Sequence, residues 1–133
     1  MTLQLAINFS LYFSVSVIAL ILFKVVYSAI TPHDEWKLIK EEQNTAAGIA
    51  FSGAIVGYAV ALYGVISNSV SLLDLVIWAV IAMVAQLLAF AIVRFIFMPK
   101  IVSRIEKGEV SAGVVLAAIS IAVGLLNSAS MTY

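Results

Sequence analysis

Four long stretches of this chain carry no charged side chain, and this pattern restricts the fold more than any other feature. The stretches cover residues 1–23, 43–73, 75–93 and 110–133. A helix needs about 20 mostly apolar residues to cross a hydrocarbon core of roughly 30 Å. Each stretch is long enough for one such helix, so the sequence predicts an all-α integral membrane protein with four transmembrane helices.

Composition supports a chain whose main solvent is lipid. Charged residues make up 11% of the sequence and hydrophobic residues 64%, whereas soluble domains average about 25% charged residues. The net charge is zero and there is no cysteine, so nothing indicates a nucleic-acid partner or a thiolate metal site. The first stretch lacks a positive n-region and is longer than a signal-peptide core, so we expect it to be retained as a span.

Prolines and polar residues predict where the spans end. The expected spans are about 4–30, 44–66, 72–97 and 110–130. Pro32 and Pro99 stop the first and third spans, because the residue before a proline is disfavoured in a helix. A charged connection follows each proline, whereas residues 67–71 form only a short turn. Spans two and three therefore make a tight hairpin, and the whole chain, residues 1–133, is expected to form a single membrane domain.

The distribution of Lys and Arg predicts the orientation. The two charged connections hold five basic residues, which are Lys37, Lys40, Lys100, Arg104 and Lys107. The two terminal segments and the turn between spans two and three hold none. Because cytoplasmic loops carry an excess of Lys and Arg, we expect both connections in the cytoplasm and both termini outside it, N-out and C-out.

The N-terminal and C-terminal halves of the chain resemble each other in sequence. Residues 43–49 (QNTAAGI) align with residues 108–114 (GEVSAGV), and the same alignment places Gly57 opposite Ala122. Each unit consists of one span, a charged connection with a proline near its start, and a span rich in small residues. Two spans per unit give both units the same orientation, as in a parallel repeat about an axis along the membrane normal. The sequence thus predicts two tandem parallel helical hairpins. The two repeats cover about 4–66 and 72–130.

Spans two and four carry small residues at spacings of three and four, which place each set on one helix face. Small faces let helix backbones approach closely in lipid, where no hydrophobic force drives association. The residues that we expect at helix contacts are Ala50, Gly53, Gly57, Ala61, Gly113, Ala117 and Gly124. Gly53 and Gly57 form a GxxxG pattern. Packing is the favoured role, and a narrow path lined by these faces is the alternative.

Three side chains are expected to anchor the helices at the membrane surface. Lys24 and Arg94 lie inside apolar stretches, and a charge at membrane depth is a functional candidate by default. Both lie about one to two turns from the expected cytoplasmic helix end, so their long side chains can extend to the headgroups. We favour this anchoring role over an ion pathway. Trp36 in the first connection suits the headgroup level.

Gln86 and His33 are the other polar candidates. Gln86 lies near the middle of span three and is too short to reach the headgroups, so its amide needs a partner on another span. We expect Gln86 to hold two spans together by a hydrogen bond, with a pore-lining or substrate-contacting role as the alternative. His33 lies beside Asp34 and Glu35. These residues can bind a divalent cation or sense protons, but sequence neighbours seldom converge on one metal, so we expect a solvated cluster.

Several segments resemble a known family. They are residues 31–39 (TPHDEWKLI), 44–47 (NTAA), 51–53 (FSG), 57–58 (GY) and 127–133 (NSASMTY). Together they resemble the YjfL-type family, a domain-of-unknown-function family of small bacterial inner-membrane proteins. The resemblance covers essentially the whole chain and implies a four-span protein of the bacterial inner membrane without an established activity. It also implies genes for envelope stress or peptide-modifying enzymes nearby, but it assigns no catalytic residue.

Motifs for catalysis do not occur in the sequence. It has no HExxH, no GxSxG, no P-loop and no glycine-rich dinucleotide turn, and nothing nominates a nucleophile with an activating base. We therefore expect no enzyme, no cofactor and no metal site. The leading hypothesis is a non-enzymatic protein, in an envelope-stress context, that contacts the lipid bilayer, other membrane proteins and copies of itself. The alternative is a small oligomeric channel or transporter.

Overall fold

The computed structural model describes residues 2–32 and 34–131, and most of these residues are helical. In chain order the elements are α1 (Thr2–Ile30), α2 (Glu35–Lys40), α3 (Thr45–Asn68), α4 (Leu72–Ile92), η1 (Val93–Phe97), α5 (Ile101–Glu106) and α6 (Val110–Ser130). The π-helical turn η1 continues α4 directly. In this described part of the chain, four helices are long and apolar enough to cross a membrane: α1, α3, α4 with η1, and α6. The predicted all-α class is confirmed, and the predicted helix ends differ from the observed ones by at most two residues.

Side-chain caps fix where three of the helices begin. The side chains of Asp34, Asn44 and Ser71 accept hydrogen bonds of 3.0–3.1 Å from backbone N–H groups at the starts of α2, α3 and α4. Each bond satisfies a donor that has no partner within its helix. The amide of Asn44 also donates to the Ile105 carbonyl at 2.8 Å. The start of α3 is thereby tied to α5 as well as capped.

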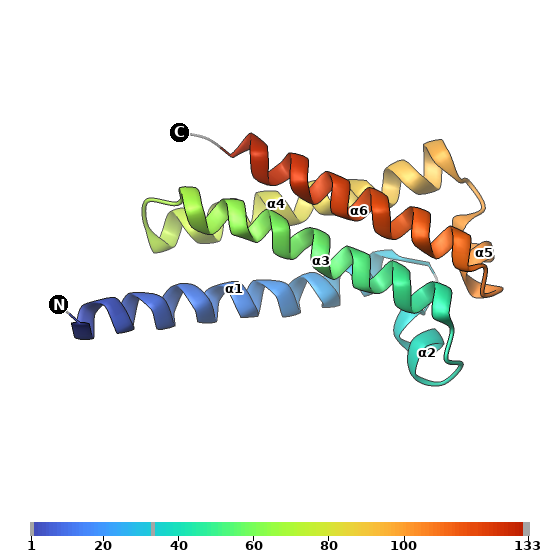
Figure 1. Cartoon of the computed structure of the whole chain (residues 1–133), viewed down its shortest axis with the longest axis horizontal. Helices are drawn as coiled ribbons and strands as arrows, with labels where there is room; N and C mark the ends of the chain where they lie inside the picture. The colour runs from blue at the N-terminus through green and yellow to red at the C-terminus, as the bar shows by residue number, and fades with distance from the viewer. Residues whose placement is uncertain (1, 33, 132–133) are drawn as a thin grey trace.

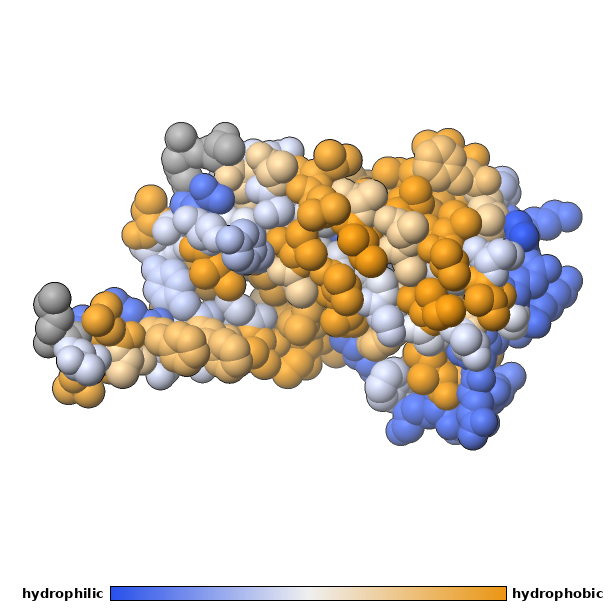
Figure 2. All heavy atoms as spheres, in the orientation of Figure 1, coloured by the Kyte–Doolittle hydropathy of each residue, from blue (hydrophilic) through white to orange (hydrophobic). Residues whose placement is uncertain are grey.

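The four long helices lie side by side along the long axis of the molecule (Figure 1). Helices α2 and α5 lie at one end, whereas the start of α1, the α3–α4 turn and the end of α6 lie at the opposite end. Hydrophilic residues gather at the α2 and α5 end, and a broad hydrophobic band covers the middle of the molecule (Figure 2). This distribution fits a bundle that crosses a membrane with α2 and α5 at one surface.

Helix α3 is the centre of the bundle. It contacts α1, α4 and α6, and its contact with α6 is by far the most extensive in the molecule. Most of its buried residues are small: Ala46, Ala47, Ala50, Gly53, Ala54, Gly57, Ala61 and Gly64. Short side chains allow the backbones of α3 and α6 to approach closely, which is how helices gain contact in lipid.

Helix α1 is the most loosely attached of the long helices. In its most apolar segment 11% of the residues are buried, compared with 50% in α3 and 33% in α6. Its buried side chains, Ala19, Phe23 and Tyr27, all lie in its second half. The N-terminal end of α1 projects beyond the rest of the bundle as an arm (Figures 1 and 2), whereas Tyr12 and Val15 already pack against the core.

The polar end of the bundle has a small apolar core of its own. Leu38 of α2 is buried there together with Ile101 and Ile105 of α5, against Val93 and Leu116 of the long helices. This core holds the two short helices against the bundle, so the charged connections have a defined shape.

The tandem repeat stays a prediction. A long helix, a short helix and a second long helix follow one another twice, as α1–α2–α3 and α4–α5–α6. The surroundings of aligned residues differ, however, because Gly57 is buried between helices whereas Ala122 is exposed. Equal sequence positions in the two halves therefore do not imply equal packing.

Candidate functional site

Small residues of α3 and α6 form a tightly packed seam along the bundle. We define the glycine seam as Gly53, Gly57 and Gly64 of α3 with Gly113 and Gly124 of α6. A Cβ atom added to any of these glycines would overlap atoms of the opposite helix, most of them backbone atoms. A Cβ on Gly53 would meet Cα of Ala117, and a Cβ on Gly124 would meet the carbonyl oxygen of Gly57. Glycine is therefore what permits this close approach.

The alanines predicted at helix contacts lie along the same helices. Ala50 and Ala61 are fully buried, and Ala117 is almost fully buried. That these small residues are needed for stability stays a prediction.

An amide cluster lies beside the glycine seam, between α4 and α6. Gln86 is 3% exposed, and its Nε2 donates a hydrogen bond to the Ser120 carbonyl at 3.1 Å. The Nδ2 of Asn127 donates to Oε1 of Gln86 at 3.3 Å and to the Ala82 carbonyl at 3.1 Å. Both polar ends of the Gln86 amide thus bind α6. This arrangement links two helices at membrane depth, where an amide without a partner is costly.

A group of aromatic rings joins α1 to α3 and α4. The ring centroid of Phe23 lies 4.6 Å from that of Tyr58 and 5.7 Å from that of Tyr27. Tyr27 meets Phe90 of α4 edge-on at 6.2 Å. The hydroxyl of Tyr58 donates a 2.7 Å hydrogen bond to the carbonyl of Ala79 in α4. These contacts are the main attachment of α1 to the bundle.

Glu35 is a buried acid that the sequence analysis did not select as a site residue. It is 1% exposed although it begins the short helix α2. Its carboxylate lies beside the phenol of Tyr27, and the neighbouring Thr31 hydroxyl donates to the Tyr27 carbonyl at 3.0 Å. An acid directly after an N-cap looks like an ordinary surface residue in a sequence, so no pattern could have revealed its burial. His33 lies outside the described residues.

The predicted anchors lie near the end of the bundle that carries α2 and α5. The Nζ of Lys24 lies 4.6 Å from the ring centroid of Trp36, so an α1 side chain reaches the short helix α2. Arg94 lies in η1, with its Cζ 5.4 Å from the ring of Phe95. All three predicted anchors are partly exposed. Their anchoring role stays a prediction.

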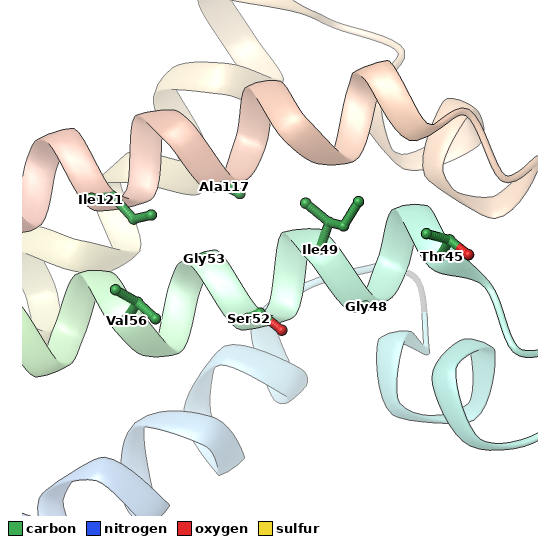
Figure 3. A pocket seen from close by; sticks show the side chains of 8 residues that line it. All are labelled: Thr45, Gly48, Ile49, Ser52, Gly53, Val56, Ala117 and Ile121. Carbon is green, nitrogen blue, oxygen red and sulfur yellow. The ribbon is translucent and has the colours of Figure 1, made fainter.

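An open groove runs along the outer side of the α3–α6 contact. It has a volume of about 500 Å³ and follows α3 from Thr45 to Val56, with Ala117 and Ile121 of α6 as its other wall (Figure 3). Its polar side chains are two hydroxyls, those of Thr45 and Ser52. Within residues 2–32 and 34–131, no group of three or more His, Asp or Glu side chains is placed to hold a metal ion.

These observations define a class of protein. The chain has four apolar helices of membrane-spanning length, charged connections at one end, and helix contacts built from small residues and amides. These features characterise a multi-span helical membrane protein. The particular family follows from comparison with known proteins. The chain belongs to the family described as Domain of Unknown Function (DUF350), whose model matches residues 1–131. This confirms the resemblance seen in the sequence.

Curated relatives of the chain are bacterial membrane proteins. The chain is 44% identical over 125 residues to the UPF0719 inner membrane protein YjfL of Escherichia coli, both in strain K12 and in O157:H7, covering 94% of this chain and 93% of the relative. It is 29% identical over 126 residues to the UPF0719 transmembrane protein YshE of Bacillus subtilis, with the same coverage. No solved structure matches the chain. The chain is therefore a bacterial inner-membrane protein with four spans.

Proposed function

We propose that this protein is a non-enzymatic component of the inner membrane that binds other membrane proteins through α1. The observation that carries the proposal is the uneven attachment of the four spans. Helices α3, α4 and α6 form a bundle closed by the glycine seam and the amide cluster, whereas the N-terminal end of α1 projects from it and the buried side chains of α1 lie in its second half. A helix that buries so little within its own chain has a long face left for another helix.

Polar residues on the projecting N-terminal end of α1 support this proposal. Gln4 and Asn8 are exposed, and Nε2 of Gln4 donates to Oδ1 of Asn8 at 2.9 Å. This bond leaves the side-chain oxygen of Gln4 (Oε1) and the side-chain nitrogen of Asn8 (Nδ2) available to a partner. Amides on transmembrane helices act as glue between helices. The helix has 29 residues and is roughly 43 Å long at about 1.5 Å per residue, so this amide pair lies toward the end of α1 that is remote from α2.

Photo-crosslinking in living cells tests the proposed role of α1. A photoreactive phenylalanine analogue replaces Phe9 of α1, which is 67% exposed, and the control replaces Leu88 of α4, which is 56% exposed. We expect discrete protein adducts from position 9 and few from position 88, and we expect Asn8→Leu to weaken the adducts. Equal adduct yields at both positions would show that α1 faces lipid. An ion flux in proteoliposomes would favour the channel alternative instead.

We further propose that the protein is oriented N-out and C-out. The end that carries α2 and α5 holds Lys37, Lys40, Lys100, Arg104 and Lys107, and such positive ends face the cytoplasm. Alkaline phosphatase fused after Tyr133 is expected to be active, and green fluorescent protein at the same place is expected to be dark. Fusions after Gly108, between α5 and α6, should give the opposite result. Fluorescence from a fusion after Tyr133 would show that the C-terminus is cytoplasmic and that the proposed orientation is wrong.

A further inference from the structure

Two lysines from different helices converge on one tryptophan ring. The Nζ of Lys24 in α1 lies 4.6 Å from the ring centroid of Trp36, and the Nζ of Lys40 in α2 lies 5.8 Å from it. The ring is held in place by Phe51 of α3, whose centroid is 5.5 Å away. The two ammonium groups are therefore positioned by three helices.

Among the described residues, neither lysine forms an ion pair with an acidic side chain. The ion pair found in that part of the chain joins Arg104 to Glu109, in the other connection. Cation–π contact with an indole attracts each ammonium group but does not neutralise it. Two like charges near one ring repel each other, and the repulsion grows where lipid lowers the local dielectric constant. An anion that binds both ammonium groups would remove this repulsion.

We propose that Lys24, Trp36 and Lys40 form a binding site for the phosphate group of an anionic phospholipid. Lysine binds phosphate as a point charge, and basic sites between transmembrane helices on the cytoplasmic side bind anionic headgroups. Lys24 lies within α1 and approaches the ring from the membrane-spanning helix, so the bound anion is at the depth of a headgroup. Tryptophan is enriched at that depth. This proposal does not depend on the proposed role of α1 in protein binding.

Other charged side chains lie near the Trp36 ring, on or next to α2. A hollow of about 420 Å³ adjoins Trp36 and Lys40, and Asp34, Lys37 and Glu41 also line it. The two acids of that hollow reduce the net positive charge around Lys40, whereas Lys24 does not line the hollow. Lys37 has no such cation–π contact with the ring, so removing Lys24 or Lys40 should affect a bound anion more than removing Lys37.

Native mass spectrometry of the full-length protein tests the lipid site. Wild type is released from nanodiscs that contain equal amounts of phosphatidylglycerol and phosphatidylcholine, and retained lipids are counted. We expect one phosphatidylglycerol to be retained preferentially. Lys24→Gln and Lys40→Gln should each lower this preference by about fivefold, the factor that corresponds to about 1 kcal/mol for one basic residue at an anionic surface. Lys24→Arg should keep the preference.

Matched controls make the result decisive. Lys107→Gln removes the same charge from the other connection and should retain phosphatidylglycerol like wild type. Thermal melting of the variants in phosphatidylcholine alone shows that they are folded. The site is overturned if Lys24→Gln and Lys107→Gln retain phosphatidylglycerol equally. It is also overturned if inorganic phosphate, added to lipid-free protein in detergent, raises the melting temperature of wild type but not of Lys24→Gln, because the ligand is then a soluble anion.

Discussion

Replacing Gly57 by leucine is expected to destabilise the bundle severely. A Cβ at position 57 already overlaps the carbonyl group of Ser120 and lies 2.8 Å from Nε2 of Gln86, and leucine adds three more carbon atoms. Backbone atoms of α6 cannot yield without separating the helices, and overpacking typically costs about 1–3 kcal/mol, sometimes more. We expect a clearly lower melting temperature in detergent for Gly57→Leu, with Gly57→Ala between it and wild type.

From the alignment of the two repeats, the sequence predicts that alanine at position 57 is milder than leucine. Ala122 aligns with Gly57 in the second repeat, but Ala122 is exposed. Its Cβ therefore reports nothing about the space at Gly57, and we expect Gly57→Ala to be destabilising as well. Gly48 provides the matched control on α3, because an added Cβ there meets nothing within 4 Å. If Gly57→Leu has the same melting temperature as Gly48→Leu and wild type, α3 and α6 do not touch at Gly57.

Replacing Tyr58 by alanine is expected to loosen α1 from the bundle. Tyr58 is fully buried, its ring lies 4.6 Å from Phe23 of α1, and its hydroxyl binds the Ala79 carbonyl of α4. Large-to-small changes at buried aromatic positions cost about 3–5 kcal/mol. Limited proteolysis in detergent should cut Tyr58→Ala within α1 faster than wild type, and its melting temperature should fall.

Two further variants show whether the effect comes from the Tyr58 ring, from its hydroxyl, or from loss of any tyrosine of α3. Tyr58→Phe keeps the ring contact and loses one hydrogen bond, so its effect should be about 1 kcal/mol. Tyr63→Ala removes the same side chain from α3 at a position that is 72% exposed, and it should behave like wild type. Equal proteolysis of the Tyr58→Ala and Tyr63→Ala variants would show that the aromatic group does not hold α1.

The positions of the four spans could be predicted because each depends on local sequence. Stretches without charge predict the helices, and prolines and polar residues predict their ends. The small faces also follow from spacing along one helix. The spacing does not identify which helix packs on such a face, because one face of small residues can pack closely against any other. That α3 is packed mainly on α6 therefore required the structure.

Candidate site residues whose surroundings come from distant segments could not be predicted. Glu35 is buried because α2 folds back against α3 and brings Glu35 beside Tyr27 of α1. The path of a short connection is not encoded in its composition. The same fold-back places Lys40 and Lys24 against Trp36. Gln86 was selected for its depth alone, since an amide in an apolar span stands out, whereas its partner Asn127 lies near the end of its span.

The pairing of α3 with α6 also sets an order in time. During synthesis α3 emerges well before α6, with α4, η1 and α5 between them. Until α6 has been made, the glycines of α3 have no α6 backbone beside them. The largest helix contact of the molecule therefore forms only after all four spans have been synthesised, and a chain that stops before α6 cannot make it. For this architecture, closure of the bundle waits for the span that is made last.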